Sequence, residues 1–135
     1  MTNTKPAEPS ARWQSKSRLA SFRYAFSGLW YMLRTQRNAW IHAAATVCVM
    51  ALGLWLSLSR IEWAILALTI GLVWMAEFIN TSLEALVDLA SPDIHPLAKV
   101  GKDVGAAAVL VAAFTSVIVG LLILGPALWA KLLAH

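Results

Sequence analysis

The sequence predicts an all-α membrane protein, with an amphipathic surface helix near the N-terminus and three transmembrane helices. Hydrophobic residues make up 59% of its 135 residues and charged residues only 13%, about half of the roughly 25% that soluble domains carry. The seven tryptophans also suit a membrane protein, because tryptophan gathers at the membrane–water interface. The length is that of one domain. A chain with so few helices cannot shield ionisable side chains from lipid within a single copy, so we expect an oligomer.

The N-terminal part of the chain divides into two segments of different composition. Residues 1–16 are polar, contain two prolines and show no apolar period, which predicts a disordered cytoplasmic tail rather than a signal peptide. In residues 17–35, leucine and aromatic residues recur at helical spacing with arginines between them. This pattern is typical of a helix lying in the membrane interface; a short soluble helix packed on its neighbours is the alternative. The membrane domain is then residues 17–135.

Three apolar stretches are each long enough to cross a membrane, which takes about 20 helical residues. The first contains the 22 uncharged residues between Arg37 and Arg60. The second must run past several acidic residues to reach an adequate length, and Pro92 and Pro96 follow it, where proline removes a backbone donor. The predicted spans are residues 39–59, 63–89 and 103–128.

The distribution of basic residues predicts how the chain crosses the membrane. Seven of the eleven basic residues precede the first span, and such flanks stay in the cytoplasm. We therefore expect the N-terminus inside, the C-terminus outside, and the loop from Ser91 to Lys102 on the cytoplasmic side. The charge abuts a membrane span instead of covering a soluble face, so it indicates lipid headgroups and not nucleic acid.

Four polar residues of the second span share one narrow face, because their spacings of three, four and four match helical periodicity. They are Glu77, Asn80, Glu84 and Asp88. Carboxylates in or near hydrocarbon are costly and mark functional sites by default. Glu77 lies deepest and suits a general base. Glu84 lies nearer the aqueous edge, where a carboxylate and phosphate oxygens could hold Mg²⁺, and Asn80 could orient either acid. A structural polar network between helices is the alternative.

Lys102 and Asp103 stand at the expected start of the third span, on the same side as the acidic stripe. A lysine beside a helix N-terminus is well placed to meet phosphate, although a positive-inside anchor explains it equally well. Together, a base, a magnesium ligand and a phosphate contact are the parts that phosphoryl transfer needs. His42 is alone on the first span, where packing or a hydrogen bond is expected.

Two other functions fit membrane carboxylates. A small proton- or cation-coupled transport subunit also uses such groups, but its acids should be spread across the bilayer, whereas these cluster at one end of the span. A structural or regulatory membrane partner would tolerate replacement of Glu77 and Glu84.

The stretch Glu77–Asp88 resembles the signature of the small bacterial diacylglycerol kinase and undecaprenol kinase family. The similarity continues through Ser91–Lys99 and Lys102–Leu110, and upstream through Phe22–Gly28 and Arg37–His42. The loop and the Arg37–His42 stretch resemble the undecaprenol kinase branch more than the diacylglycerol kinase branch. The resemblance covers roughly residues 21–122.

This resemblance implies a homotrimer in the bacterial inner membrane, with active sites shared between protomers at the cytoplasmic face. MgATP would donate its γ-phosphate to the hydroxyl of a lipid alcohol, most closely undecaprenol or else diacylglycerol. Glu77 would be the base, Asn80 and Asp103 further catalytic positions, and Glu84 a ligand of metal and nucleotide. The implied nucleotide contacts are Tyr24, Asp93, His95, Lys102 and Asp103.

The chain departs from the family pattern at one position. Where the family often has a second metal-binding glutamate just before the first span, this sequence has Gln36. An amide offers an oxygen without a charge, so Gln36 would contribute to the Mg²⁺ and nucleotide site more weakly than a carboxylate. The metal would then rely chiefly on Glu84 and phosphate.

Overall fold

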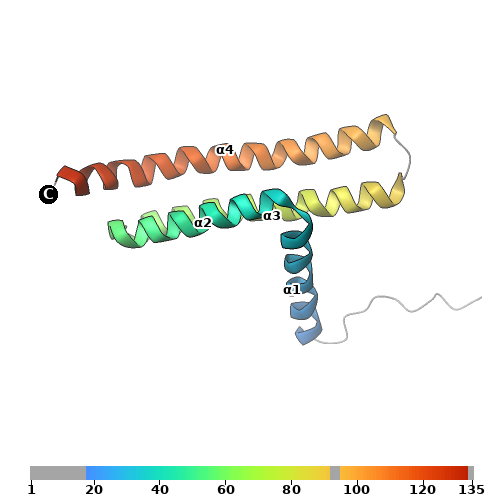
Figure 1. The fold of residues 1–135 in the computed structure, drawn as a ribbon, viewed down its shortest axis with the longest axis horizontal. Coiled ribbons are helices and arrows are strands. Elements are labelled where there is room, and N and C mark those ends of the chain that lie inside the picture. Colours follow the sequence, from blue (N-terminus) through green and yellow to red (C-terminus); the bar gives the residue numbers. More distant parts are fainter. Residues whose placement is uncertain (1–17, 92–94, 134–135) are drawn as a thin grey trace, which may run out of the picture. The chain divides into compact units, whose positions relative to one another are not determined.

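The computed structural model describes residues 18–91 and 95–133, and every element in them is an α-helix. The four helices are α1 (Arg18–Thr35), α2 (Arg37–Leu56), α3 (Arg60–Ala90) and α4 (Pro96–Leu133) (Figure 1). The last three are long and apolar enough to cross a membrane, which confirms the predicted all-α class with three spans. The predicted tail over residues 1–16 lies outside the described residues.

The chain divides after Tyr31 into two compact units. The first contains most of α1, in which the Arg23 guanidinium carbon lies 5.8 Å from the centre of the Tyr24 ring. The second contains the three long helices, with α3 antiparallel to both α2 and α4 (Figure 1). Of the two neighbours, α4 packs more extensively against α3.

A short turn joins α2 to α3, and local capping explains both of its ends. Ser57 adopts the left-handed conformation (φ 56°, ψ 49°), and Leu58 N–H donates to the Gly53 carbonyl at 3.2 Å, a hydrogen bond that closes a helix C-terminus. Ser59 and Glu62 form a capping box, in which each side chain bonds the other residue's backbone N–H. Because of this cap, α3 begins at Arg60, ahead of the predicted residue 63.

Helix α4 begins at Pro96 rather than near residue 103, so the expectation of a loop extending to Lys102 is wrong. Proline suits the first turn of a helix because its missing N–H would have no partner there. The Leu97 N–H donates to Nδ1 of His95 at 3.2 Å, which satisfies one more free donor of the first turn. Lys102 and Asp103 therefore lie inside the helix, more than one turn from its start.

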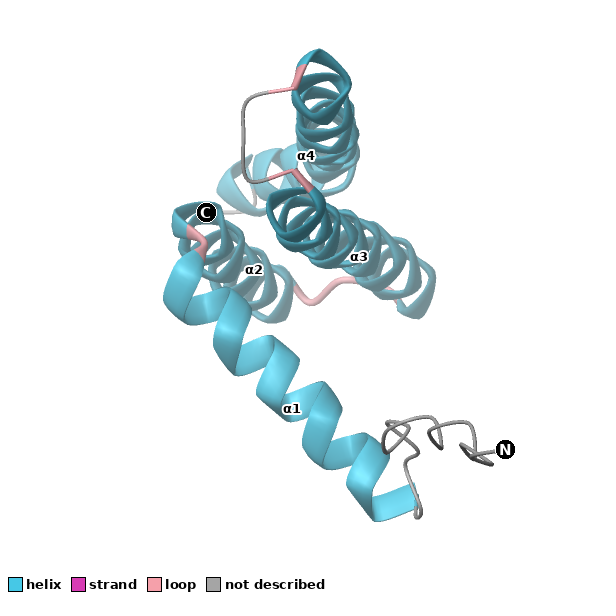
Figure 2. Ribbon diagram, turned by 90° about the vertical axis from the view of Figure 1, so that its right-hand side faces the viewer, coloured by secondary structure: helices cyan, strands magenta, loops and turns pink. Residues whose placement is uncertain are grey.

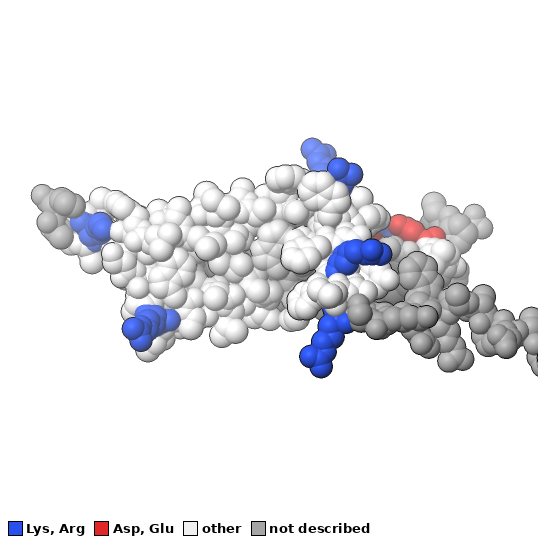
Figure 3. Space-filling model, turned by 90° about the horizontal axis from the view of Figure 1, so that it is seen from below, with Lys and Arg blue, Asp and Glu red and all other residues white. Residues whose placement is uncertain are grey.

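The buried core of the described chain is small. Its buried apolar residues are few, while most large apolar side chains of the long helices are exposed. Figure 2 shows the three helices nearly end-on, and Figure 3 shows a long stretch of surface without charged side chains. Such a surface needs hydrocarbon or another apolar helix around it. The buried apolar residues are Met32, Ala39, Leu66, Val73 and Val109, and the buried polar ones Glu77, Asn80 and Thr81.

Polar contacts hold the long helices in register at two levels. Near the C-terminus of α4, Lys131 Nζ donates to the Trp55 carbonyl at 2.6 Å and lies 5.0 Å from the centre of that indole ring. Near the polar stripe, Trp74 Nε1 donates to the Thr46 hydroxyl at 3.2 Å, and Thr46 in turn donates to the His42 carbonyl at 2.7 Å. The second contact fixes α2 against α3 close to the acidic residues.

Candidate active site

The polar stripe of α3 becomes steadily more exposed along the helix. Glu77 is 1% exposed and Asn80 7%, Glu84 is half-buried, and Asp88 is exposed. The deepest acid is therefore also the one most completely removed from solvent. A carboxyl group so buried is unusual unless it is paired or used.

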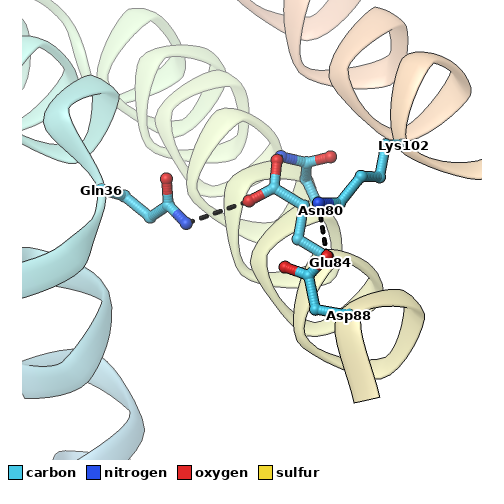
Figure 4. A network of polar contacts seen from close by, with 5 residues as sticks. All are labelled: Gln36, Asn80, Glu84, Asp88 and Lys102. Atoms are coloured by element: carbon cyan, nitrogen blue, oxygen red, sulfur yellow. Dashed lines mark hydrogen bonds and ion pairs between the residues drawn. The ribbon is translucent and has the colours of Figure 1, made fainter. Parts of the chain in front are cut away.

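Glu84 is at the centre of a set of hydrogen bonds that links two helices. Asn80 Nδ2 donates to Glu84 Oε1 at 3.0 Å, and Gln36 Nε2 donates to Glu84 Oε2 at 3.1 Å (Figure 4). A carboxylate only accepts hydrogen bonds, so both amides turn their NH₂ groups toward it. Gln36 can reach across because it is the N-cap of α2 and its side chain makes no capping bond.

These residues line a pocket of about 310 Å³ between α2, α3 and α4. Its polar lining includes Gln36, His42, Glu77, Asn80 and Glu84, and apolar residues of α4 close its other side. Within the described part of the chain, Glu77 Oε2 is buried without a hydrogen-bond partner. Such an oxygen destabilises the folded state unless something bonds it, so the pocket offers an acceptor to a hydroxyl group.

His42 and Asn38 are polar residues of this pocket that the sequence did not assign to a site. His42 lies in the same pocket as Glu77. The spacing of Asn38 and His42 could have indicated this, because residues four apart share a helix face, and both line the pocket.

Lys102 bonds to the exposed end of the stripe instead of the pocket. Its Nζ lies 2.6 Å from Oδ1 of Asp88 (Figure 4), and this ion pair joins α4 to the last turn of α3. Asp103 pairs with Lys99 on its own helix, and both side chains are mostly exposed. The structure therefore brings Gln36, Glu77, Asn80 and Glu84 together but not Asp103.

Among the residues that it describes, the structure does not bring the remaining predicted nucleotide contacts into the pocket lining. His95 is exposed and accepts the Leu97 N–H at the start of α4. Asp93 lies outside the described residues, and Tyr24 belongs to the N-terminal unit. Their proposed roles stay predictions.

A second hollow, of about 700 Å³, lies between α3 and α4. Apart from threonines and Asn80, its lining is apolar or glycine, and no ionisable side chain contributes to it. Asn80 lines this groove and the polar pocket alike. The larger hollow thus has no group that could act as an acid or a base, whereas the smaller pocket contains Glu77, Glu84 and His42.

The donor set for a divalent metal is sparse. Among residues 18–91 and 95–133, no three His, Cys, Asp or Glu side chains converge on one point. Glu84 and Gln36, the predicted metal ligands, lie within hydrogen-bond distance of each other. One carboxylate and one amide oxygen suit Mg²⁺, which often takes only one or two carboxylates and completes its shell with water and substrate phosphates.

Known proteins similar to this chain are lipid kinases. It is 47% identical to undecaprenol kinase of Bacillus subtilis over 108 residues, which cover 80% of this chain and 88% of the relative. It is 45% identical to a diacylglycerol kinase of Synechocystis over 125 residues, 92% of this chain and 71% of the relative. A diacylglycerol kinase of Escherichia coli is 33% identical over 95 residues, 65% of this chain and 78% of the relative.

The matches cover the polar pocket and the helices that build it. Residues 23–124 fit the family model described as prokaryotic diacylglycerol kinase, and this range contains every predicted site residue from Tyr24 to Asp103. With a family match over most of its length and relatives at this level of identity, the chain belongs to the prokaryotic diacylglycerol kinase family.

Proposed function

We propose that this chain transfers the γ-phosphate of ATP to the hydroxyl group of undecaprenol, with diacylglycerol as the alternative acceptor. As a member of its family it is an ATP-dependent lipid kinase of the membrane. The relative named undecaprenol kinase matches at slightly higher identity than the diacylglycerol kinase of Synechocystis. The resemblance of the Arg37–His42 stretch to the undecaprenol kinase branch supports the same choice.

The burial of Glu77 is the observation that supports this chemistry best. Its carboxyl group is 1% exposed, has an oxygen without a partner in the described chain, and faces a pocket with Glu84 at its more exposed end. A lipid hydroxyl entering that pocket could donate to the free oxygen and lose its proton to it as the phosphoryl group is transferred. Asn80 would keep Glu84 oriented through its amide.

The magnesium and nucleotide contacts are proposed from the polar residues of this pocket and from the family resemblance. Glu84 would hold Mg²⁺ together with the Gln36 oxygen, after the Gln36 amide turns over and its NH₂ group leaves Glu84. The ion would neutralise charge on the transferred phosphate. Lys102 would leave Asp88 to meet phosphate, and Asp93, His95 and Asp103 would complete the nucleotide site together with Tyr24. Asp88 and phosphate are both anions, so they can compete for the same ammonium group.

The assembly and orientation in the membrane are also proposals. The exposed apolar surface and the small buried core support a homotrimer in which protomers share active sites. The exposed leucine, phenylalanine and tryptophan side chains of α1, interleaved with arginines, support an amphipathic helix on the cytoplasmic surface. The basic N-terminal segment supports an inner-membrane protein with its N-terminus and active site on the cytoplasmic side.

The test is phosphate transfer from radiolabelled ATP to undecaprenol and to diacylglycerol, each presented in mixed micelles to the purified protein. We expect a Mg²⁺-dependent product with at least one acceptor and a higher kcat/KM for undecaprenol. A higher value for diacylglycerol would reverse the choice of substrate. No product with any of a panel of lipid alcohols would overturn the proposed reaction.

The comparisons lend no support to the transport alternative. That function predicts ion flux in liposomes without ATP, which the same purified protein can be used to measure. A purely structural role predicts that replacing Glu77 and Glu84 leaves function intact.

A further inference from the structure

One glycine of α4 lies directly against a polar side chain of the candidate active site. Gly105 is buried, and a Cβ atom added there would overlap Oδ1 of Asn80 and approach Leu83 Cδ1 to 3.7 Å. The other glycines of α4 differ. A Cβ at Gly101 would meet its nearest neighbour at 3.7 Å, and at Gly120 and Gly125 it would meet nothing within 4 Å.

The orientation of the Asn80 amide explains why the oxygen points at Gly105. Asn80 Nδ2 donates to Glu84 Oε1 at 3.0 Å, so the amide oxygen must face the opposite way, toward α4. In the described chain this oxygen is buried without a conventional donor. In place of a side chain, Gly105 directs a Cα–H group toward the Asn80 oxygen. Such groups form weak hydrogen bonds with oxygen atoms at helix interfaces.

We propose that Gly105 is a positioning residue for the kinase reaction, because the missing side chain leaves the space that holds the Asn80 amide turned toward Glu84. This inference rests on the proposed role of Glu84. The Asn80 oxygen lies where α3 meets α4, and Asn80 is 7% exposed, so a methyl group at residue 105 would displace the amide from its present position. The amide must rotate or the helices must separate, and either change loosens Glu84.

The first test compares two alanine variants on the same helix. We expect Gly105→Ala to lower kcat per folded molecule by about tenfold to a hundredfold, the range that a small misplacement of a catalytic group produces. Gly120→Ala, where the methyl group enters open space, is the matched control and should keep wild-type kcat. The folded fraction is measured by size-exclusion chromatography and circular dichroism in the same detergent.

The second test separates contact with Asn80 from general helix packing. Unfolding temperatures are measured for Gly105→Ala and Asn80→Ala, alone and combined. Removing the amide removes the obstacle, so Gly105→Ala should destabilise the wild type but add little in the Asn80→Ala background. This cycle does not depend on catalysis, so it stays informative even if the wild type phosphorylates no lipid and the proposed function fails.

Three results would overturn the inference. One is a Gly105→Ala protein with wild-type kcat. Another is a fall in total activity that is explained entirely by a smaller number of folded molecules. The third is an equal destabilisation by Gly105→Ala with and without Asn80, which would mean that the glycine serves packing alone. If the single variant does not fold, restored folding in the double variant supports the inference, and failure of both contradicts it.

Discussion

Two groups of polar residues at the same end of the long helices differ in how firmly the fold holds them. The buried cluster (Gln36, Glu77, Asn80 and Glu84) lies between α2, α3 and α4. Amide–carboxylate hydrogen bonds join three of its members, Gln36, Asn80 and Glu84. The exposed pairs, Asp88–Lys102 and Lys99–Asp103, are joined by opposite charges at the surface.

The difference shows that burial, and not formal charge, decides which polar groups of this chain have a prescribed position. An exposed ion pair contributes little because water and salt screen it and two long side chains lose freedom. In the buried cluster, each unmet hydrogen bond destabilises the fold. We therefore expect Asn80 and Glu84 to be positioned before substrate arrives, and the exposed pairs to exchange partners when a nucleotide binds.

The largest expected effect is that of Glu77→Gln. Glutamine keeps the shape but cannot accept the proton of the lipid hydroxyl, so kcat should fall by about 10²- to 10⁴-fold, the usual contribution of a general base. The unfolding temperature should stay the same or rise, because a buried carboxyl group without a partner is removed. Phosphate transfer from radiolabelled ATP and thermal unfolding are the measurements.

Glu62→Gln is the control for Glu77→Gln, since Glu62 is an acid of the same helix that caps its other end, away from the pocket. Its kcat should equal that of the wild type. Undiminished activity of Glu77→Gln would end the proposed role of this residue as the base.

The second largest effect is expected for Glu84→Gln. This change removes the carboxylate proposed to bind Mg²⁺ and leaves two amides facing a third, so the half-saturating Mg²⁺ concentration should rise by about tenfold or more, as when supporting groups of metal sites are lost. The measurement is a titration of initial rates with Mg²⁺ at saturating ATP. An unchanged titration would place the metal elsewhere.

The sequence predicted the buried cluster better than the exposed pairs, for a physical reason. Helical periodicity places Glu77, Asn80 and Glu84 on one face whatever surrounds the helix. The loop after α3 was wrongly extended to Lys102, because a proline was interpreted as a stop when Pro96 begins a helix. The ion pairs of Lys102 and Asp103 form because both residues lie inside a helix that begins at Pro96. With the helix start placed at residue 103, these pairs could not be predicted.

The contribution of α2 was predicted only in part. Gln36 was assigned to the metal site from the family resemblance, and the structure places its amide 3.1 Å from Glu84. His42 was expected to pack or to form a hydrogen bond, because a single histidine on an apolar helix carries no pairing information. His42 comes near Glu77 only because of the way α2 packs against α3. The Trp74–Thr46 hydrogen bond joins these two helices, and no sequence pattern predicts that bond.

A smaller effect, of opposite sign, is expected for Gln36→Glu. A second carboxylate beside Glu84 should repel it without metal and lower the unfolding temperature. A unit charge near a cation contributes on the order of 1 kcal/mol even in water, so the half-saturating Mg²⁺ concentration should fall by about fivefold.

Thermal unfolding with and without Mg²⁺ tests Gln36→Glu independently of activity, because the ion should stabilise the variant more than the wild type. Gln36→Met, which removes the amide without adding charge, is the control. Equal stabilisation of Gln36→Glu and wild type by Mg²⁺ would contradict a metal position between Gln36 and Glu84.

The smallest effects on stability are expected for the exposed pairs, and here two lysines of one helix can be compared directly. Lys99→Met and Lys102→Met each break one ion pair that is open to solvent, so neither should shift the unfolding temperature as much as Glu84→Gln does. Their kinetics should differ, because only Lys102 is proposed to leave its carboxylate and meet phosphate, so KM for ATP should rise in Lys102→Met alone. An equal rise in both variants would mean that ATP is attracted by the net charge of the α4 N-terminus and not by a specific contact, and it would remove Lys102 from the proposed nucleotide site.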